Sequence, residues 1–217
     1  MSILIAYPKG RLGDELMQLL VDTPLALDAV AMKSRVLRIP TATPEVQALL
    51  LKGSDLPRYV AAGVAALGIV GSDTLDELDM DLLELADLEF GACRMSLCVP
   101  QGTTLEELRN RPHLRLATKF LRSTEAWLAR EGLTAELVPL SSSVELAPLL
   151  GLADGIVDLV QTGGTLKAHG LVEIALLGRS SARLVAARGA YLSEPHRIQP
   201  LAEILIQALR PRPTAAN

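Results

Sequence analysis

The sequence predicts an α/β protein with largely parallel sheets. Short apolar runs of strand length alternate along the chain with segments of helical periodicity, and turns that contain Gly and Pro separate them. Hydrophobic residues make up 49% of the 217 residues and aromatic residues only 3%, so Leu, Val, Ala and Ile must build the core. This composition is typical of a folded protein and argues against a disordered chain.

The elements of the first half follow from apolar periodicity and turn chemistry. An apolar run over residues 2–7 predicts a buried strand, and the turn Pro8-Lys9-Gly10-Arg11 follows it. Apolar residues at helical spacing predict a helix over residues 14–21. Asp55 as N-cap with Pro57 just inside predicts another helix. The full set here is strands over 36–39, 66–70 and 94–99, and helices over 55–62 and from 74 onward.

The second half continues the alternation. Gly132 ends one predicted helix, and the Pro-rich tail from Arg210 is expected to fray. The predicted strands are 114–118, 135–140, an apolar run before Thr162, 172–177 and 182–187. The predicted helices are 104–109, 123–131, 143–150, one opening at Leu166, and 195–209.

The order of these elements predicts two lobes. Pro100-Gln101-Gly102 follows a strand and resembles a crossing point between lobes. The last strands and the final helix need a sheet to join, so the first lobe should be discontinuous. We expect residues 1–99 plus 176–217 in the first lobe and residues 100–175 in the second. A ligand would bind in a cleft between two such lobes.

Charge and cysteine usage restrict the function classes. The chain carries 21 Lys and Arg against 25 Asp and Glu, a net charge of -4 that does not suggest a nucleic-acid or membrane binder. No segment is apolar for long enough to span a bilayer, and the N-terminal apolar run is too short for a signal peptide. Cys93 and Cys98 match no redox or zinc spacing and fit core thiols. A cytoplasmic protein is expected.

The segment DGIVDLVQTGGTLKAHGL, residues 154–171, is the most informative one. An apolar strand leads into Thr162-Gly163-Gly164-Thr165 at the start of a predicted helix. Such a turn can bind phosphate, because glycines let the backbone approach the anion and hydroxyls and free N–H groups donate to it. Asp154 and Asp158 precede the turn and could accept hydrogen bonds from ribose hydroxyls or hold a hydrated Mg2+. The alternative is a tight connection in which glycine only permits the turn.

Four segments together resemble the short form of ATP phosphoribosyltransferase, the first enzyme of histidine biosynthesis. They are IAYPKGRL, DLPRYVAAGVAALGIVGSDTLDE, RLATKF and SSSVELAPLLGLADGIVDLVQTGGTLKAHGL. The resemblance covers nearly the whole chain and implies a two-lobed fold like type II periplasmic binding proteins. It also implies the reaction: N1 of the ATP adenine attacks C1 of phosphoribosyl pyrophosphate (PRPP) and pyrophosphate leaves. Mg2+ is expected to accompany the substrate phosphates.

The resemblance assigns roles to individual residues. The segment from Asp154 to Leu166 would bind PRPP, with Thr162, Gly163, Gly164, Thr165 and Leu166 around the 5-phosphate and Asp154 or Asp158 near the ribose. Gly164 stands where many relatives carry a longer, often basic residue.

The first lobe would supply cations. Lys9 and Arg11 could reach pyrophosphate or the ATP phosphates, although a solvated turn is the ordinary fate of such residues. Arg35 matches a family arginine of the active site. Lys52 stands where relatives commonly carry arginine, and lysine lacks the bidentate fork.

Three further residues are candidates for ATP binding or for the cleft. Gly71 and Asp73 follow a strand end, with a plain turn as the alternative. Glu145 could face the ligand or could complement a helix dipole.

The resemblance also predicts partners. Long-form relatives add a regulatory domain after the last helix, whereas short-form members work with a separate subunit that resembles histidyl-tRNA synthetase. We therefore expect a homodimer of this chain within a hetero-oligomer. The rival interpretation is a non-catalytic solute-binding or effector-sensing module on the same scaffold, which the fold alone does not separate from the enzyme.

Overall fold

The computed structural model describes residues 2–28 and 36–209 and divides the chain into two compact units. Unit 1 contains Met1–Gly91 and Ser181–Asn217, and unit 2 is Ala92–Ser180. One unit is thus discontinuous and the other is inserted in it. The boundaries differ from those expected after residue 99 and before residue 176. Strands β6 (Cys93–Pro100) and β10 (Leu171–Ser180) both lie wholly in unit 2, because they pair with each other along their length.

Within the described residues, unit 1 contains a mixed six-stranded sheet of order β2-β3-β1-β4-β11-β5. Strand β1 lies between β3 and β4 and is parallel to both. Strand β11 is antiparallel to β4 and to β5, so the returning chain completes the sheet. The strands are β1 (Ile3–Pro8), β2 (Arg38–Pro40), β3 (Val46–Leu51), β4 (Leu67–Gly71), β5 (Leu83–Asp87) and β11 (Ala182–Ala186).

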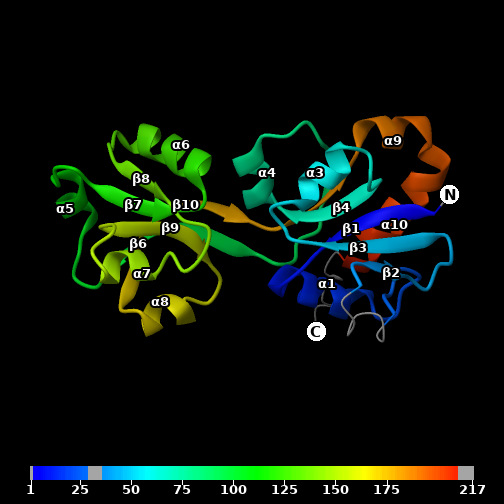
Figure 1. Ribbon diagram of the computed structural model, residues 1–217, viewed down its shortest axis with the longest axis horizontal. Coiled ribbons are helices and arrows are strands. Elements are labelled where there is room, and N and C mark those ends of the chain that lie inside the picture. Colours follow the sequence, from blue (N-terminus) through cyan, green and yellow to red (C-terminus); the bar gives the residue numbers. More distant parts are fainter. Residues whose placement is uncertain (1, 29–35, 210–217) are drawn as a thin grey trace, which may run out of the picture. The chain divides into compact units, whose positions relative to one another are not determined.

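Helices cover both faces of this sheet (Figure 1). Helices α1 (Arg11–Leu20) and α10 (Pro195–Leu209) contribute Leu16, Leu20 and Leu205 to the larger core cluster. The opposite face packs against α3 (Leu56–Ala61) and α4 (Ser72–Leu78). Helix α9 (Arg188–Ser193) precedes α10.

Unit 2 contains a five-stranded sheet of order β10-β6-β9-β7-β8 among the residues that the structure describes. Strands β7, β9 and β8 run parallel, whereas β6 is antiparallel to both of its neighbours. The strands not yet bounded are β7 (Arg115–Thr118), β8 (Glu136–Pro139) and β9 (Gly155–Val160).

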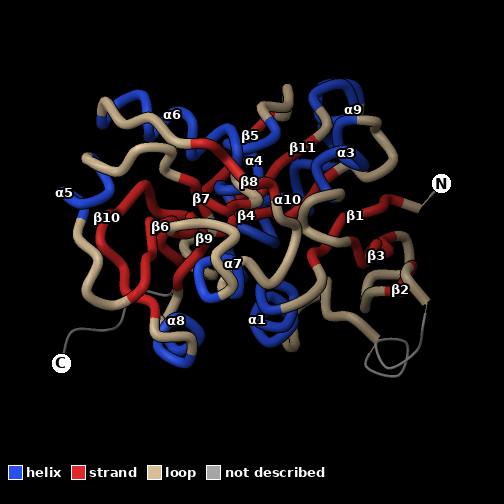
Figure 2. Tube along the Cα trace, turned by 60° about the vertical axis from the view of Figure 1, so that its left-hand side comes forward, coloured by secondary structure: helices blue, strands red, loops and turns tan. Residues whose placement is uncertain are grey.

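The two faces of the unit 2 sheet carry different helices, as Figure 2 also shows. Helices α5 (Leu105–Arg109) and α6 (Leu121–Glu131) cover the face that includes Val157 and Trp127. Helices α7 (Leu146–Leu149) and α8 (Gly164–Ala168) lie on the other face, where Ile156 and Leu166 are buried. This second face is called the α7/α8 face below.

The sequence did not predict β3, β5 or α9. Periodicity cannot separate a short apolar run such as ALLL, residues 48–51, from a piece of a buried helix. Helix α7 is shorter than predicted, and α8 begins at Gly164 rather than at Leu166. None of the helices in residues 2–28 and 36–209 is long and apolar enough to cross a membrane.

Candidate active site

The phosphate-loop candidate lies at the carboxyl edge of the parallel strands of unit 2. Strands β7, β8 and β9 run in the same direction, so the segments that follow them leave the sheet at one edge. Lys119 follows β7, and Gln161 and Thr162 follow β9. Ligands of parallel sheets bind at this edge, because the loops there are not needed for strand pairing.

The loop itself is open to solvent and has free donors. Thr162, Gly164 and Thr165 are exposed, and Gly163 has φ +79°, a left-handed conformation that favours glycine. Among the described residues, the backbone N–H groups of residues 162–165 donate to no other backbone group, and neither threonine hydroxyl is hydrogen-bonded. Leu166 is buried in the core of the α7/α8 face and anchors the loop, so only its backbone can meet a ligand. The predicted phosphate loop therefore presents a row of unused donors.

Asp158 lies on β9, two residues before the end of the strand. It shares the α7/α8 face with Ile156 and Val160, because strand residues alternate between faces. Its half-buried carboxylate is 3.2 Å from Lys119 Nζ, measured at Oδ1. That oxygen is buried and accepts no hydrogen bond within the described chain, so this contact is an ion pair only.

Lys119 is a site residue that the sequence analysis missed. The preceding Thr118 is fully buried, and its hydroxyl donates to Val157 O at 2.8 Å and accepts from Phe120 N at 2.9 Å. These bonds tie the turn after β7 to β9 and place Lys119 beside Asp158. The available signal was its position directly after an apolar strand, within the segment RLATKF.

Asp154 lies at the wrong end of β9 for the predicted role. It precedes Gly155 at the start of the strand, and six strand residues span roughly 20 Å. Its carboxylate accepts from Arg111 Nη1 at 2.6 Å and from Arg115 N at 2.8 Å. Asp154 is therefore a structural residue that fastens the amino edge of the sheet, and this corrects the prediction that it could meet the ribose.

Glu145 lies directly before α7, on the α7/α8 face. Its half-buried side chain makes no capping bond to the helix, and within the described residues no hydrogen bond or ion pair holds it. The capping alternative thus has no contact to support it.

Unit 1 also gathers candidate residues at a carboxyl edge. Pro8 and Leu51 are register partners at the ends of the parallel strands β1 and β3. The exposed residues Lys9 and Lys52 follow these two positions. Gly71 ends β4, which is parallel to β1, and so lies at the same edge.

The remaining unit 1 candidates are less informative. Asp73 is in the first turn of α4 and accepts from Thr74 Oγ1 at 3.2 Å. The Arg11 guanidinium is 3.7 Å from Glu15 and donates to Gly91 O at 3.5 Å, which ties α1 to the end of the first chain segment of unit 1. Arg35 lies outside the described residues.

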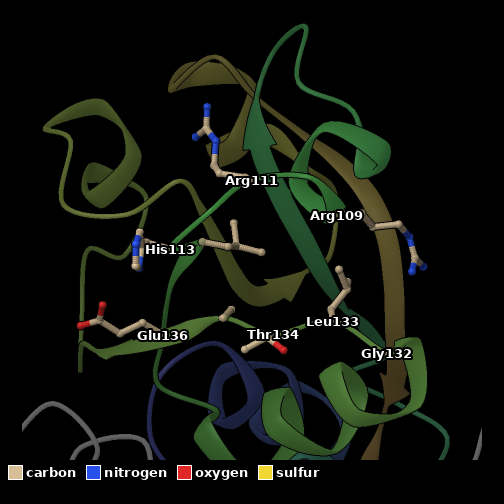
Figure 3. A pocket seen from close by; sticks show the side chains of 9 residues that line it. Arg109, Arg111, His113, Gly132, Leu133, Thr134 and Glu136 are labelled. Carbon is tan, nitrogen blue, oxygen red and sulfur yellow. The ribbon is translucent and has the colours of Figure 1, made fainter.

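An open hollow of about 480 Å³ in unit 2 does not coincide with these residues (Figure 3). It is lined by residues before β7 and before β8, at the amino edge of the sheet. Arg109 and Arg111 point away from each other there and are paired with Glu131 and Asp154. Because both guanidinium groups are already neutralised, the hollow does not offer an anion site.

The fold and the two carboxyl edges define a class: a two-unit α/β protein of periplasmic-binding-protein type with donor groups suited to phosphates. The alkanesulfonate-binding protein SsuA of Xanthomonas axonopodis pv. citri has a similar fold, with a TM-score of 0.61 and 17% identity over 95% of this chain and 72% of that one. At this identity the likeness concerns the fold alone.

Sequence comparison is more specific. The model of the HisG family, ATP phosphoribosyltransferase, matches residues 52–207. The ATP phosphoribosyltransferase of Moorella thermoacetica is 41% identical over 211 residues, 95% of this chain and 92% of the relative. That of Deinococcus deserti is 43% identical over 97% of this chain and 94% of its own. The ATP phosphoribosyltransferase (HisG:HisZ) complex of Thermotoga maritima contains a chain with a TM-score of 0.80 and 28% identity, covering 95% of this chain and 98% of that one. The chain belongs to the ATP phosphoribosyltransferase family.

Proposed function

We propose that this chain is a catalytic subunit that transfers phosphoribosyl from PRPP to N1 of the ATP adenine and releases pyrophosphate. The observation that carries the proposal is the exposed loop of residues 162–165, with free N–H groups and hydroxyls, beside the carboxylate of Asp158. The family relationship supplies the reaction, and the loop supplies a place for its 5-phosphate.

Asp158 is the ribose residue in this proposal. Its position on the last turn of strand before the loop puts a carboxylate one sugar's length from a phosphate bound there, whereas Asp154 is engaged at the other edge. A carboxylate can accept hydrogen bonds from both ribose hydroxyls. Lys119, beside Asp158, would add positive charge close to the pyrophosphate that leaves from C1.

The chemistry demands electrostatic stabilisation and positioning more than a nucleophilic side chain. Adenine N1 has its own lone pair, and the difficult step is loss of the bond to pyrophosphate. Placed cations stabilise the negative charge that develops on that group. Lys9 and Lys52, together at the carboxyl edge of unit 1, are the proposed cations for pyrophosphate or the ATP phosphates, with Arg11 and Arg35 as further candidates.

Mg2+ fits this site as a companion of the substrates. The described residues contain no group of three His, Cys, Asp or Glu that could hold a metal by themselves. Mg2+ ordinarily binds through one or two carboxylates together with substrate phosphates. Asp158 is the carboxylate available for that role, and the ion would neutralise charge on the pyrophosphate.

We also propose a regulatory partner. The similar Thermotoga maritima chain is part of a HisG:HisZ complex. By this analogy the present chain would form a homodimer and assemble with a subunit that resembles histidyl-tRNA synthetase. Size-exclusion chromatography with the cognate subunit should show a larger complex, and unchanged elution would contradict this part of the proposal.

The activity is tested by incubating the full chain with ATP, PRPP and Mg2+, with and without the partner, while near-ultraviolet absorbance reports the modified adenine. Thr162→Val should raise the KM for PRPP far more than the KM for ATP. Thr134→Val is the matched control, because Thr134 is an exposed threonine of the same unit before β8. PRPP binding without product in the presence of the partner would favour a non-catalytic module instead. Unaltered turnover of Lys9→Ala would remove that lysine from the mechanism.

A further inference from the structure

A polar row crosses strands β10 and β6 on the way to the phosphate loop. Glu173 of β10 receives two bonds from the Arg94 guanidinium of β6, Nε to Oε2 at 3.2 Å and Nη2 to Oε1 at 2.8 Å. The hydroxyl of Ser96 also donates to Oε2, at 2.7 Å. This fork-to-fork geometry fixes the plane of the guanidinium as well as its position.

The backbone of β10 is irregular where it presents this glutamate. Glu173 is opposite Cys98, but the next register pair is Ala175 with Leu97, so Ile174 is an extra residue on β10. Such a bulge changes the direction of neighbouring side chains and is common near active sites.

Arg94 has a further nitrogen that reaches the start of the phosphate loop. Its Nη1 donates to Gln161 O at 3.4 Å, and Arg94 is the register partner of Val160, the last residue of β9. The Gln161 carbonyl belongs to the same peptide group as the N–H of Thr162. In a trans peptide these two bonds point in opposite directions. A carbonyl held toward Arg94 therefore turns the Thr162 N–H away from the sheet, as a donor to a bound phosphate must be.

The same row meets the ribose residue. Ser96 is the register partner of Asp158, so the Glu173 network lies directly beside the strand segment that carries the proposed ribose carboxylate. The positive charge of Arg94 is matched by Glu173 and serves the loop through its geometry. Exposed ion pairs by themselves contribute little to stability, so this one should be noticed mainly through the ligand.

We propose that Glu173 is a positioning residue for PRPP: it holds Arg94 so that the guanidinium fixes the Gln161 carbonyl and thereby the donors of the phosphate loop. This inference rests on the proposed function of that loop.

The test is Glu173→Gln in the full chain, assayed with its partner where the partner is needed for turnover. Gln has the same shape and keeps one acceptor oxygen, but it loses the charge and the fork-to-fork pairing. We expect the KM for PRPP to rise about fivefold or more, with the KM for ATP and kcat each changed less than twofold, since an interaction that only prepares a binding site acts on that substrate. Arg94→Lys, which keeps the charge but loses the fork, should give the same pattern.

The matched control is Glu131→Gln. Glu131 is paired with Arg109 at 3.0 Å in the same unit with similar exposure, but that pair lies at the hollow of the amino edge. It should leave both KM values unchanged.

The outcomes separate this inference from the proposed function. A PRPP effect in Thr162→Val without one in Glu173→Gln and Arg94→Lys, both folded by circular dichroism, overturns the positioning role alone. Equal effects on ATP and PRPP also overturn it. No PRPP effect in Thr162→Val, or no product from the wild type with its partner, refutes the loop assignment and this inference with it. If Glu173→Gln does not fold, the result for Arg94→Lys decides.

Discussion

The two aspartates of β9 offer the sharpest test of the site, because the structure assigns them opposite roles. Asp154 accepts two short hydrogen bonds at the amino edge, and Asp158 has a buried oxygen without a hydrogen bond beside the carboxyl edge. The perturbation is Asp→Asn at each position, which keeps the shape and removes the charge.

The expected magnitudes follow from these contacts. Hydrogen bonds to a charged group contribute about 1.5–3 kcal/mol, so losing the ribose contact of Asp158 should lower kcat/KM for PRPP about 10- to 150-fold. Its stability should change little, because no hydrogen bond is lost. Asp154→Asn should instead lower the free energy of unfolding by about 1–3 kcal/mol, or roughly 2–4 °C in Tm for each kcal/mol, and leave kcat/KM nearly unchanged.

The assay combines initial rates at varied PRPP and saturating ATP with thermal melts of each variant. The reasoning is refuted if Asp154→Asn lowers kcat/KM for PRPP as much as Asp158→Asn does while its melting temperature stays that of the wild type.

Three further predictions concern the core. The Tyr7 hydroxyl is buried without a hydrogen-bond partner in the described chain, and burial raises the pKa of this phenol; Tyr7→Phe should therefore raise the free energy of unfolding by about 1 kcal/mol in urea titrations, and a loss of stability would reveal a partner. A Cβ at Gly13 would lie 1.9 Å from the Pro8 carbonyl oxygen, so Gly13→Ala should cost at least about 3 kcal/mol, whereas Gly189→Ala, with nothing within 4 Å, should be neutral or stabilising in the same titration. Burial raises the pKa of the Cys98 thiol to about 12, so this cysteine should resist thiol reagents at pH 8 until denaturant is added, and rapid labelling of the native protein would contradict its place in the core.

Local sequence signals determined much of this protein. Apolar runs bounded by turn residues located most strands, and Asp55 with Pro57 located α3. The small and hydroxyl residues of TGGT identified the loop that the structure leaves exposed, because backbone freedom and donor groups are properties of the residues themselves. The buried state of both cysteines was also predicted, and it is confirmed.

Other features depended on which strands became neighbours. Asp154 and Asp158 are equivalent in sequence as carboxylates before a loop, and only the direction of β9 sends them to opposite edges. Lys119 became a site residue because β7 pairs with β9, and Glu173 met Arg94 across 79 positions of the chain because β10 returns beside β6. The sequence alone determined the chemistry of the loop, since that chemistry is local. The tertiary structure decided which charges accompany it, since strand pairing joins residues that no local pattern connects.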